Sequence, residues 1–240
     1  GTADTKGNIF ALLQAAENVP PQNCLFLFSV DEESGGIESG VSWFLQSSYR
    51  KNIKSAVICE PTELEFVYRH PGYCSFEIIF SGETGHSSDK NKMDSIENAA
   101  KAALVLKKND YHLGLIEGGK SGNTAASNAV LRVSKRSFQT PSILQEEIIN
   151  LLKDIPGKRL NPRMLGPSFS NPLGLPDFNL TGNKEAGFWT EAALFQEAGV
   201  SSLVFGAGSI KQAHKQDEFV SLEQLKGCQL FFENLFRGNQ

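Results

Sequence analysis

The first quarter of the chain alternates between amphipathic segments and continuously apolar runs. Residues 5–19 carry apolar side chains at helical spacing, which predicts a helix with one buried face. The apolar runs at 24–30 and 54–59 have the length of strands, and they predict strands buried on both faces. Residues 37–48 predict a second helix between them. This succession of helix, strand, helix and strand predicts a parallel α/β sheet.

The pattern changes after Glu60-Pro61. Residues 72–82 alternate between apolar and polar side chains, which is typical of a strand with one solvent-exposed face. A helix, two strands and a second helix are expected to follow, at 92–108, 112–119, 129–138 and 142–155. A β-α-β-β-α-β order is that of a two-layer, ferredoxin-like α+β sandwich. We therefore predict an inserted domain at residues 68–168.

The Gly- and Pro-rich stretch 166–176 predicts a crossing back to the first domain. A helix, a strand and a closing amphipathic helix follow, at 188–199, 201–205 and 221–236. Residues 1–67 and 169–240 are therefore expected to form one α/β domain, whose mostly parallel sheet is flanked by helices and whose chain is interrupted by the inserted domain.

Composition and charge narrow the classes of partner. A hydrophobic content of 40% and a charged content of 21% are ordinary for a globular protein. The net charge of −4 and the lack of a basic stripe argue against a nucleic-acid partner. No apolar run approaches the length that spans a bilayer, and no secretory signal is visible, so we expect a cytoplasmic protein. The four cysteines are far apart and predict buried, reduced thiols rather than a disulfide framework or a sulfur metal site.

Acidic and imidazole side chains follow the carboxyl ends of three predicted strands. They are Glu32 and Glu33 after the first strand, Glu60 after the second, and His214 after the strand at 201–205. Ligands of open α/β sheets bind at this edge, so we expect these groups on one rim. Asp4 precedes the first helix and could reach the same rim.

Carboxylates crowd together when a cation lies between them. One Asp, several Glu and one His form a ligand set that suits Zn²⁺, Co²⁺ or Mn²⁺ better than Cu(I) or an iron–sulfur cluster. A plainer alternative is that the acids at 31–33 are a solvated turn before a helix, whose N-terminus favours negative charge. Asp4 could likewise only cap its helix, Glu60 could be a loop acid, and His214 could be a surface histidine.

Five motifs occur in an order that resembles the M20 metallopeptidase and deacylase family. They are ADTKG (3–7), DEESGG (31–36), EPTEL (60–64), GHSS (85–88) and GAG…AHKQDEF (206–219). The resemblance extends from residue 1 to the C-terminus, and it is greatest to the acetylornithine and acetylcitrulline deacetylases, which YRHPGY (68–73) and FWTEAALF (188–195) resemble. It implies a zinc-exopeptidase-like catalytic domain with an inserted dimerisation or lid domain.

The resemblance also implies a site with two divalent metal ions, Zn²⁺ first, with Co²⁺ or Mn²⁺ as alternatives. Asp4 matches the carboxylate that bridges the metals. Glu33 and Glu60 match terminal ligands, one on each metal, and His214 matches the terminal histidine of the second metal. Glu32 matches the general base.

Further residues of the resemblance concern the substrate, a small N-acyl amino acid. His86 matches a histidine that reaches across a homodimer to the reacting carbonyl, and the dimer forms through the inserted domain. Asn123 and Arg136 match positions that bind the substrate's carboxylate, and Gly208 borders the same end of the substrate. Their plainer interpretations are a turn histidine for His86 and a solvated strand arginine for Arg136.

Two departures from the family pattern stand out. The family has an upstream histidine, which binds the first metal, and an aspartate shortly after it; this chain opens on GTADTKG and has no counterpart of either. As the sequence stands, Asp4 and Glu60 would remain for that metal. The segment near 170–180 is also shorter than in the family and lacks helical periodicity.

The resemblance predicts a metal-dependent amidohydrolase that releases acetate from acetylornithine or acetylcitrulline in arginine biosynthesis. Glu32 would act as general base on a metal-bound water. The alternatives are another M20 hydrolase, such as a succinyl-diaminopimelate desuccinylase, an aminoacylase or a dipeptidase, and a non-catalytic dimerising or ligand-binding homologue.

Overall fold

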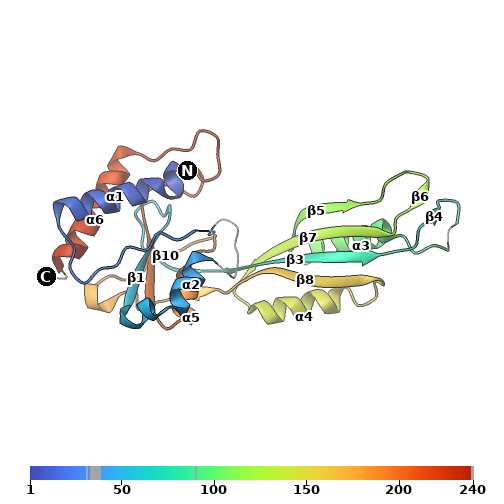
Figure 1. Cartoon of the computed structure of the whole chain (residues 1–240), viewed down its shortest axis with the longest axis horizontal. Coiled ribbons are helices and arrows are strands. Elements are labelled where there is room, and N and C mark those ends of the chain that lie inside the picture. The colour runs from blue at the N-terminus through green and yellow to red at the C-terminus, as the bar shows by residue number, and fades with distance from the viewer. Residues whose placement is uncertain (31, 33–38, 90, 239–240) are drawn as a thin grey trace. The chain divides into compact units, whose positions relative to one another are not determined.

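The computed structural model of the chain describes residues 1–30, 32, 39–89 and 91–238 (Figure 1). These residues form two compact units. The inserted unit is Gly72–Ser168, and the interrupted unit contains the described residues before Gly72 and from Phe169 onward. The inserted unit therefore begins four residues later than the sequence predicts. The reason is that the strand at 67–70 hydrogen-bonds within the interrupted unit.

The sheet of the interrupted unit has the order β1-β11-β2-β10, and β9 pairs with β2 outside this path. Its members are β1 (Ser55–Cys59), β2 (Val67–His70), β9 (Phe169–Ser170), β10 (Lys184–Glu185) and β11 (Ser201–Phe205). The longest ladder is the parallel pair β1 and β11, which confirms the predicted parallel α/β arrangement. Its two strands end at Cys59 and Phe205, so the segments that follow them begin at one edge of the sheet.

The apolar run at 24–30 is not assigned as a strand, and the prediction of a buried strand there is wrong. Leu25, Phe28 and Val30 are 47%, 55% and 67% exposed. Cys24 is exposed too, which corrects the expectation that it is buried. Apolar composition shows only that a segment favours burial. A ladder also needs a neighbouring strand, and none of the described residues forms one with this run.

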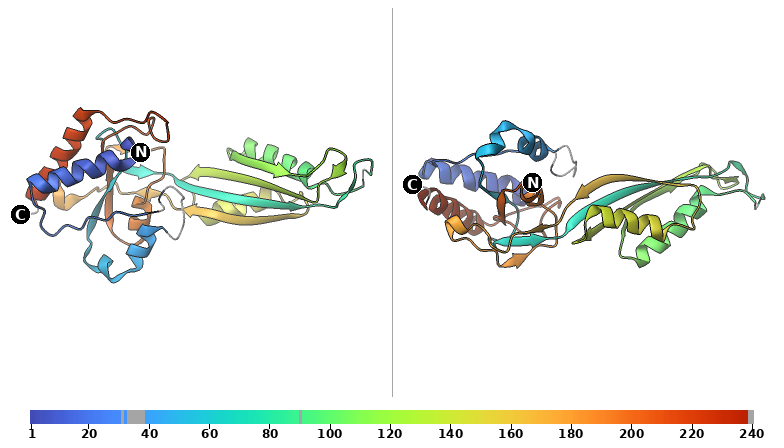
Figure 2. Two further views of the ribbon diagram at one scale, coloured as in Figure 1. Left: turned by 45° about the horizontal axis from the view of Figure 1, so that its top comes forward. Right: turned by 90° about the horizontal axis from the view of Figure 1, so that it is seen from below.

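Helices cover this sheet. The N-terminal π-helical turn η1 (Thr2–Lys6) leads into α1 (Gly7–Asn18), which packs against α6 (Leu222–Gly238), as Figures 1 and 2 show. Small side chains on α1 let the helices approach closely, and the larger ones come from α6: Ala11, Ala15, Cys228, Phe232 and Phe236. The remaining helical segments are α2 (Gly40–Gln46), η2 (Ser48–Asn52), η3 (Pro176–Phe178) and α5 (Ala192–Glu197).

The inserted unit has the predicted β-α-β-β-α-β order. Its antiparallel sheet runs β5-β7-β3-β8, and its strands are β3 (Gly72–Ser81), β5 (His112–Gly118), β7 (Asn128–Ser137) and β8 (Lys158–Gly166). The helices α3 (Ser95–Lys108) and α4 (Pro141–Leu151) cover one face (Figure 2). Alternate residues of β3 point into this core, namely Cys74, Phe76, Ile78 and Phe80, so the period-two pattern is confirmed.

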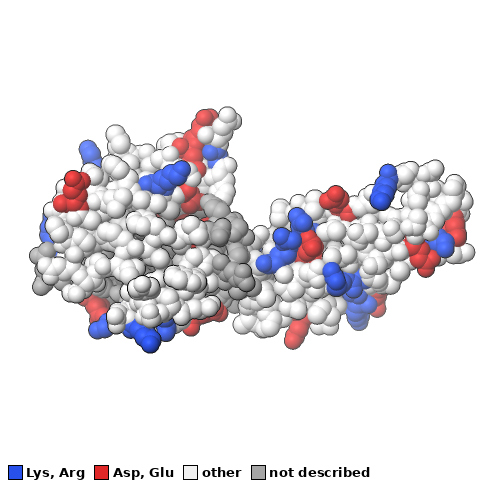
Figure 3. All heavy atoms as spheres, viewed as in Figure 1, with Lys and Arg blue, Asp and Glu red and all other residues white. Residues whose placement is uncertain are grey.

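A two-stranded sheet of β4 (Gly85–His86) and β6 (Thr124–Ala125) lies at one end of the inserted unit (Figure 1). On the face shown in Figure 3, positive and negative side chains are interspersed over both units and form no single basic stripe. None of the described helices combines the length and apolar character needed to cross a membrane.

Candidate active site

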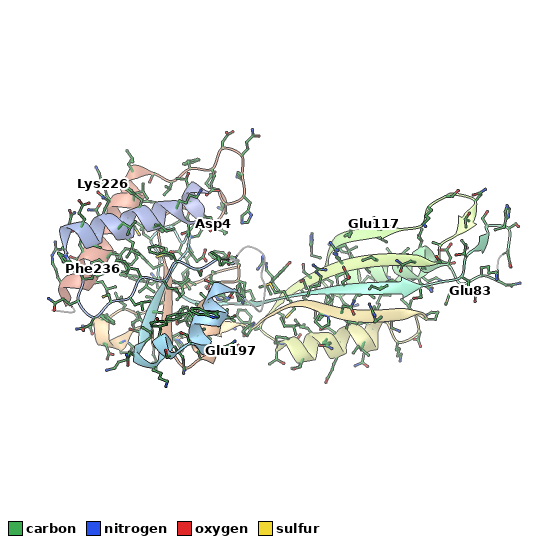
Figure 4. All side chains as sticks on the ribbon, viewed as in Figure 1. Asp4, Glu83, Glu117, Glu197, Lys226 and Phe236 are labelled. Carbon is green, nitrogen blue, oxygen red and sulfur yellow. The ribbon has the colours of Figure 1, made fainter. Side chains whose placement is uncertain are left out.

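Asp4 and His214 are brought together in the interrupted unit, although 210 positions of sequence separate them. The Nε2 atom of His214 lies 3.5 Å from Oδ2 of Asp4. Asp4 lies just before α1 (Figure 4), and His214 belongs to the loop between β11 and α6. A charge-assisted hydrogen bond between such groups is usually about 2.7–2.9 Å long. The pair is therefore adjacent without a short direct bond.

The segment that carries Asp4 is attached to the end of β1. The hydroxyl of Thr5 donates a 3.2 Å hydrogen bond to the carbonyl oxygen of Cys59. Asp4 and Glu60 are the immediate neighbours of these two residues. Glu60 is buried, and its own N–H donates to the carbonyl of Phe205 at the end of β11. Three distant segments therefore meet at the edge where the sequence predicts a site.

Asn8, which the motif analysis did not single out, joins α1 to the loop after β11. Its Nδ2 donates to the hydroxyl of Thr5 at 2.9 Å and to the carbonyl of Ala207 at 3.1 Å. The N–H of Ala207 donates back to Oδ1 of Asn8 at 2.7 Å. Asn8 is fully buried, so these hydrogen bonds are shielded from water. An isolated asparagine in a helix carries no sequence signal of such a role.

Two glycines of this loop are required by close backbone approaches. A Cβ on Gly206 would lie 2.6 Å from the carbonyl oxygen of Glu60. Gly208 has φ of +98°, and a Cβ there would also meet Ala3. The predicted substrate residue Gly208 thus packs against the segment that carries Asp4. Its N–H donates to the side chain of Gln224 at 2.7 Å.

Glu218 is a second residue that sequence reasoning missed. Its carboxylate accepts the N–H of Asp4 at 2.8 Å, and the N–H of Ala3 also contributes. These backbone hydrogen bonds lower the pKa of Glu218 below its ordinary value of 4.5. Neighbouring Asp217 is exposed and has the same charge, so the letters of the motif do not distinguish the two acids.

Glu32, the predicted general base, lies in a turn and is partly buried, whereas Asp31 and Glu33 lie outside the described residues. The ends of the segment around Glu32 are held together. The N–H of Gly40 donates to the carbonyl of Val30 at 3.0 Å, and the hydroxyl of Ser29 donates to Glu191 at 3.1 Å. These bonds hold Ser29 close to Glu191, and Val30 close to Gly40 on the other side of residues 31–38.

Glu191 supports this brace from the start of α5. Its side chain is buried, and burial raises the pKa of its carboxyl above the ordinary 4.5 despite hydrogen bonds from Ser29 and Ser39. Ser29 and Ser39 stand on either side of residues 31–38. Glu191 Oε1 has no hydrogen-bond partner among the described residues. A carboxyl in such surroundings favours the protonated form.

Within the described parts of the chain, no group of three or more His, Cys, Asp and Glu side chains is arranged to hold a metal ion. The structure pairs Asp4 with His214, and it joins the residues next to Asp4 and Glu60 through the bond from the Thr5 hydroxyl to the carbonyl of Cys59. Glu33 is outside the residues that the structure describes. Of the predicted ligands, the structure thus shows one close pair, and it holds the backbone of Glu60 at the end of β11.

His86 of the inserted unit contacts Ser88 twice through Nδ1, which favours one tautomer of its neutral ring. The backbone N–H of Ser88 donates to Nδ1 of His86 at 3.2 Å, and the hydroxyl of Ser88 is 2.8 Å from the same atom. A nitrogen that accepts an N–H bond carries no proton, so the neutral ring has its proton on Nε2. His86 is exposed, and its Nε2–H is therefore a donor at the surface.

Asn123 lies beside His86, but Arg136 does not. His86 pairs with Thr124 across β4 and β6, and the carbonyl of Asn123 accepts the N–H of Ser87 at 3.0 Å. Arg136 is near the opposite end of β7, where its guanidinium stacks on Tyr73. Strands advance about 3.3 Å per residue, so positions 128 and 136 of β7 are about 26 Å apart. Figure 1 places β4 and β6 beyond the far end.

Comparison with known proteins shows which family has this arrangement. Residues 68–159 match the peptidase dimerisation domain of the M20 family. The N-acetyl-L-citrulline deacetylase of Xanthomonas campestris pv. campestris is 29% identical over 270 residues, covering 94% of this chain and 69% of that protein. The acetylornithine deacetylase of Pectobacterium atrosepticum is 30% identical, with 94% and 68% covered. The chain belongs to the M20 metallopeptidase family.

Solved structures agree with this assignment of the fold. A tripeptidase from Staphylococcus aureus superposes on this M20 chain with a TM-score of 0.78 at 20% identity, covering 100% of this chain and 72% of that one. An M20 family metallo-carboxypeptidase from Sulfolobus solfataricus has a TM-score of 0.74 at 12% identity, with 100% and 76% covered. At these identities the likeness concerns the fold.

Membership of this M20 family implies a divalent metal ion, and Asp4 and His214 fit one. Zinc binds carboxylate oxygen and imidazole nitrogen at about 2.0–2.1 Å in tetrahedral geometry, which places two such ligands about 3.3 Å apart. The observed separation of 3.5 Å is close to that value. The N–H of Asp4 bonds to Oε1 of Glu218 at 2.8 Å, so this oxygen is less available as a ligand.

A cavity of about 330 Å³ opens beside the Glu60 segment of this M20 chain. Its apolar lining comes from Pro61, Val67, Ala186, Phe188 and Ile210. Charged residues complete the wall, among them Glu63 and Lys184, whose side chains form an ion pair at 3.6 Å. The cavity thus has an apolar wall next to one positive and one negative side chain.

Proposed function

We propose that this chain is a metal-dependent amidohydrolase that removes the acetyl group from an N-acetylated amino acid. The substrate class is acetylornithine or acetylcitrulline, and the reaction belongs to arginine biosynthesis. The observation that supports the chemistry is the approach of His214 to Asp4 at 3.5 Å, beside the end of β1. The substrate class is suggested by the two deacetylases at 29% and 30% identity.

Asp4, Glu33, Glu60 and His214 would hold the metal ions. A bound divalent ion supplies Lewis acidity and lowers the pKa of a coordinated water from 15.7 to about 7. The 3.5 Å approach of His214 to Asp4 supports the roles proposed for these two residues, whereas those of Glu33 and Glu60 rest on the resemblance of their motifs.

Glu32 is assigned the proton transfers. It would take a proton from the attacking water and give it to the departing amine, so that one carboxyl serves as base and then as acid. Separate roles for Glu32 and Glu33 make sense because a carboxylate engaged with a metal is less free to move a proton. The brace formed by Ser29, Ser39 and Glu191 would keep Glu32 at a constant position.

His86 is assigned the donor to the negative oxygen that develops on the substrate's carbonyl. Its Nε2–H is oriented for donation because Ser88 engages Nδ1. His86 and Asn123 lie beyond the Asn128 end of β7, and Arg136 lies about 26 Å from Asn128 along that strand. One substrate can therefore touch both groups only if they come from two chains. We accordingly propose a homodimer whose inserted unit supplies His86 and Asn123 to its partner's site.

The cavity beside Pro61 is proposed to receive the side chain of the amino acid. Its apolar lining suits the three methylene groups shared by ornithine and citrulline, and its ion pair meets the polar end of either one. Gly208 and Arg136 would then face the α-carboxylate.

The test is acetate release from a panel of N-acetyl amino acids, with and without a chelator. We expect release from acetylornithine or acetylcitrulline that is abolished by chelation and restored by Zn²⁺ or Co²⁺. Glu32→Gln is expected to keep the metal content of the wild type and to lower turnover by about 10²-fold or more.

The matched control is Glu17→Gln, which makes the same change on the surface of α1, where the carboxylate accepts an exposed hydrogen bond from Gln14. Turnover that persists in Glu32→Gln would remove the role assigned to Glu32. Chelator-resistant acetate release would contradict metal dependence, and no release from any acetylated amino acid would contradict the substrate class.

A further inference from the structure

We propose that Glu218 is a positioning residue that holds Asp4 in register with His214. The proposal rests on the metal site described above and concerns how its two closest ligands are kept together. Glu218 and His214 belong to the same loop between β11 and α6, and both contact the segment that carries Asp4. The loop therefore contacts Asp4 twice, at the backbone through Glu218 and at the carboxylate through His214.

Glu218 contacts the backbone of the Asp4 segment and not its side chain. Oε1 of Glu218 accepts the N–H of Asp4 at 2.8 Å, and the N–H of Ala3 also points to this carboxylate. The side chain of Glu218 is only 9% exposed, although it carries a charge. A carboxylate that accepts successive N–H groups fixes the direction of the peptide units between them. The direction of the Asp4 side chain follows from that of its backbone.

Backbone hydrogen bonding explains how the carboxylate of Glu218 can lie near that of Asp4. The backbone N–H groups offset the negative charge of Glu218, which leaves the carboxylate of Asp4 free to face His214. The amino group of Gly1 also lies 3.5 Å from Oε2 of Glu218. The bond to the N–H of Asp4 uses the other oxygen and does not depend on that amino group.

Without Glu218, the loop and the Asp4 segment would lose the hydrogen bond that joins them at Asp4 itself, and the bonds of Asn8 to Thr5 and Ala207 would remain. Ligand pairs that are no longer held at their binding separation must be ordered when the metal binds, and affinity falls. Substitution of residues that orient metal ligands typically weakens binding by about 10–100-fold. We therefore expect Glu218→Ala to weaken Zn²⁺ binding by about 10–100-fold, although Glu218 itself is not a ligand.

The measurement is the Zn²⁺ dissociation constant, obtained by competition with a chromophoric chelator. Asp217→Ala is the matched control, because it removes one exposed negative charge from the adjacent position. It is expected to leave the constant within about twofold of wild type, since exposed charges contribute little. Glu218→Gln keeps the length and one acceptor oxygen, and it should restore part of the affinity. A short N-terminal extension removes the charge next to Gly1 and should leave the difference between variants unchanged.

A general loss of stability is separated from positioning by a double-mutant cycle with His214→Ala. If Glu218 acts by aligning Asp4 with His214, its removal should cost much less affinity once His214 is gone. Equal losses in both backgrounds, or wild-type affinity in Glu218→Ala, would overturn the proposal. If Glu218→Ala fails to fold by circular dichroism, Glu218→Gln against Asp217→Asn decides the question in the same way. Absence of Zn²⁺ binding in the wild-type chain would overturn the metal site itself, and this proposal with it.

Discussion

Replacement of Asn8 by alanine tests whether one buried side chain connects the two halves of the candidate site. The amide of Asn8 bonds to both the N–H and the C=O of Ala207, at 2.7 and 3.1 Å, and to Thr5 at 2.9 Å. Asn8 and Ala207 are both almost completely buried. Asn8→Ala therefore leaves two backbone groups of Ala207 without their amide partner.

The expected cost follows from these two groups. A buried polar group that loses its partner costs about 1–3 kcal/mol. The thiol of Cys228 remains near the N–H of Ala207 as a weak acceptor, so we take the lower part of the summed range. Alanine regains about 0.5 kcal/mol of helix propensity. Two such groups sum to about 2–6 kcal/mol, and the lower half of that range less about 0.5 kcal/mol gives a net loss in the free energy of unfolding of about 1.5–3.5 kcal/mol.

Tryptophan fluorescence during urea unfolding suits this measurement. The two tryptophans, Trp43 and Trp189, both lie in the interrupted unit, so their signal reports the unit that contains Asn8. Asn18→Ala is the control, because it changes the same residue type in the same helix. Asn18 makes one exposed hydrogen bond, to Glu233, and its loss should cost less than about 1 kcal/mol.

Equal destabilisation by Asn8→Ala and Asn18→Ala would refute this reasoning. It would mean that the hydrogen bonds of Asn8 contribute no more than a bond exposed to water. A loss below about 1 kcal/mol in Asn8→Ala would refute it as well, because two unsatisfied buried backbone groups of Ala207 should destabilise the fold by more than that.

Three further predictions concern a pH dependence, the dimer and the thiols. Burial raises the pKa of Glu191 in the folded state above 4.5, so the free energy of unfolding of the wild type should fall as pH rises from about 4.5 through that pKa. Glu191→Gln lacks this loss, so its stability relative to wild type should increase over the same pH range. Urea titrations at several pH values measure the difference. Glu32→Gln and His86→Ala chains should each be nearly inactive. If His86 acts across the dimer, mixing equal amounts should restore about a quarter of wild-type acetate release, because half of the dimers are mixed and each of these has one intact site of two. No recovery would place His86 in the site of its own chain. Cys24 is exposed, whereas burial raises the pKa of Cys59 to about 12. Cys24→Ser should therefore abolish the fast reaction with a thiol reagent at pH 8. A fast phase that remains would contradict the exposed position of Cys24.

Much of the element order could be read from the sequence because it depends on local periodicity. The alternation of apolar residues along β3 and the helical spacing in α1, α3 and α6 are confirmed, as is the α/β fold with its ferredoxin-like insertion. The run at 24–30 shows the limit of this reasoning. Its composition is that of a buried strand, yet no described strand pairs with it, and its apolar side chains are exposed.

The argument that strand ends of a parallel sheet meet at one edge holds for Glu60 and for the loop of His214, which follow β1 and β11, but the strand expected before Glu32 is not seen among the described residues. Motif order alone nevertheless selected Asp4, Glu32, Glu60 and His214 as candidates. It could not reveal Asn8 or Glu218, since their roles consist of hydrogen bonds to backbone groups about 200 positions away. Backbone groups are the same at nearly every residue, so the sequence does not indicate which of them a side chain will bind. Nor could it show that Arg136 and Asn123 lie near opposite ends of β7.

What the sequence by itself determined is therefore the type and order of most of the elements, and which residues are candidates to bind a metal or move a proton. The tertiary structure decided which of these approach one another: it brings His214 within 3.5 Å of Asp4 and holds the two segments together through Asn8 and Glu218. The physical reason is that periodicity is a property of neighbouring residues, whereas a site depends on contacts between segments that only folding brings together.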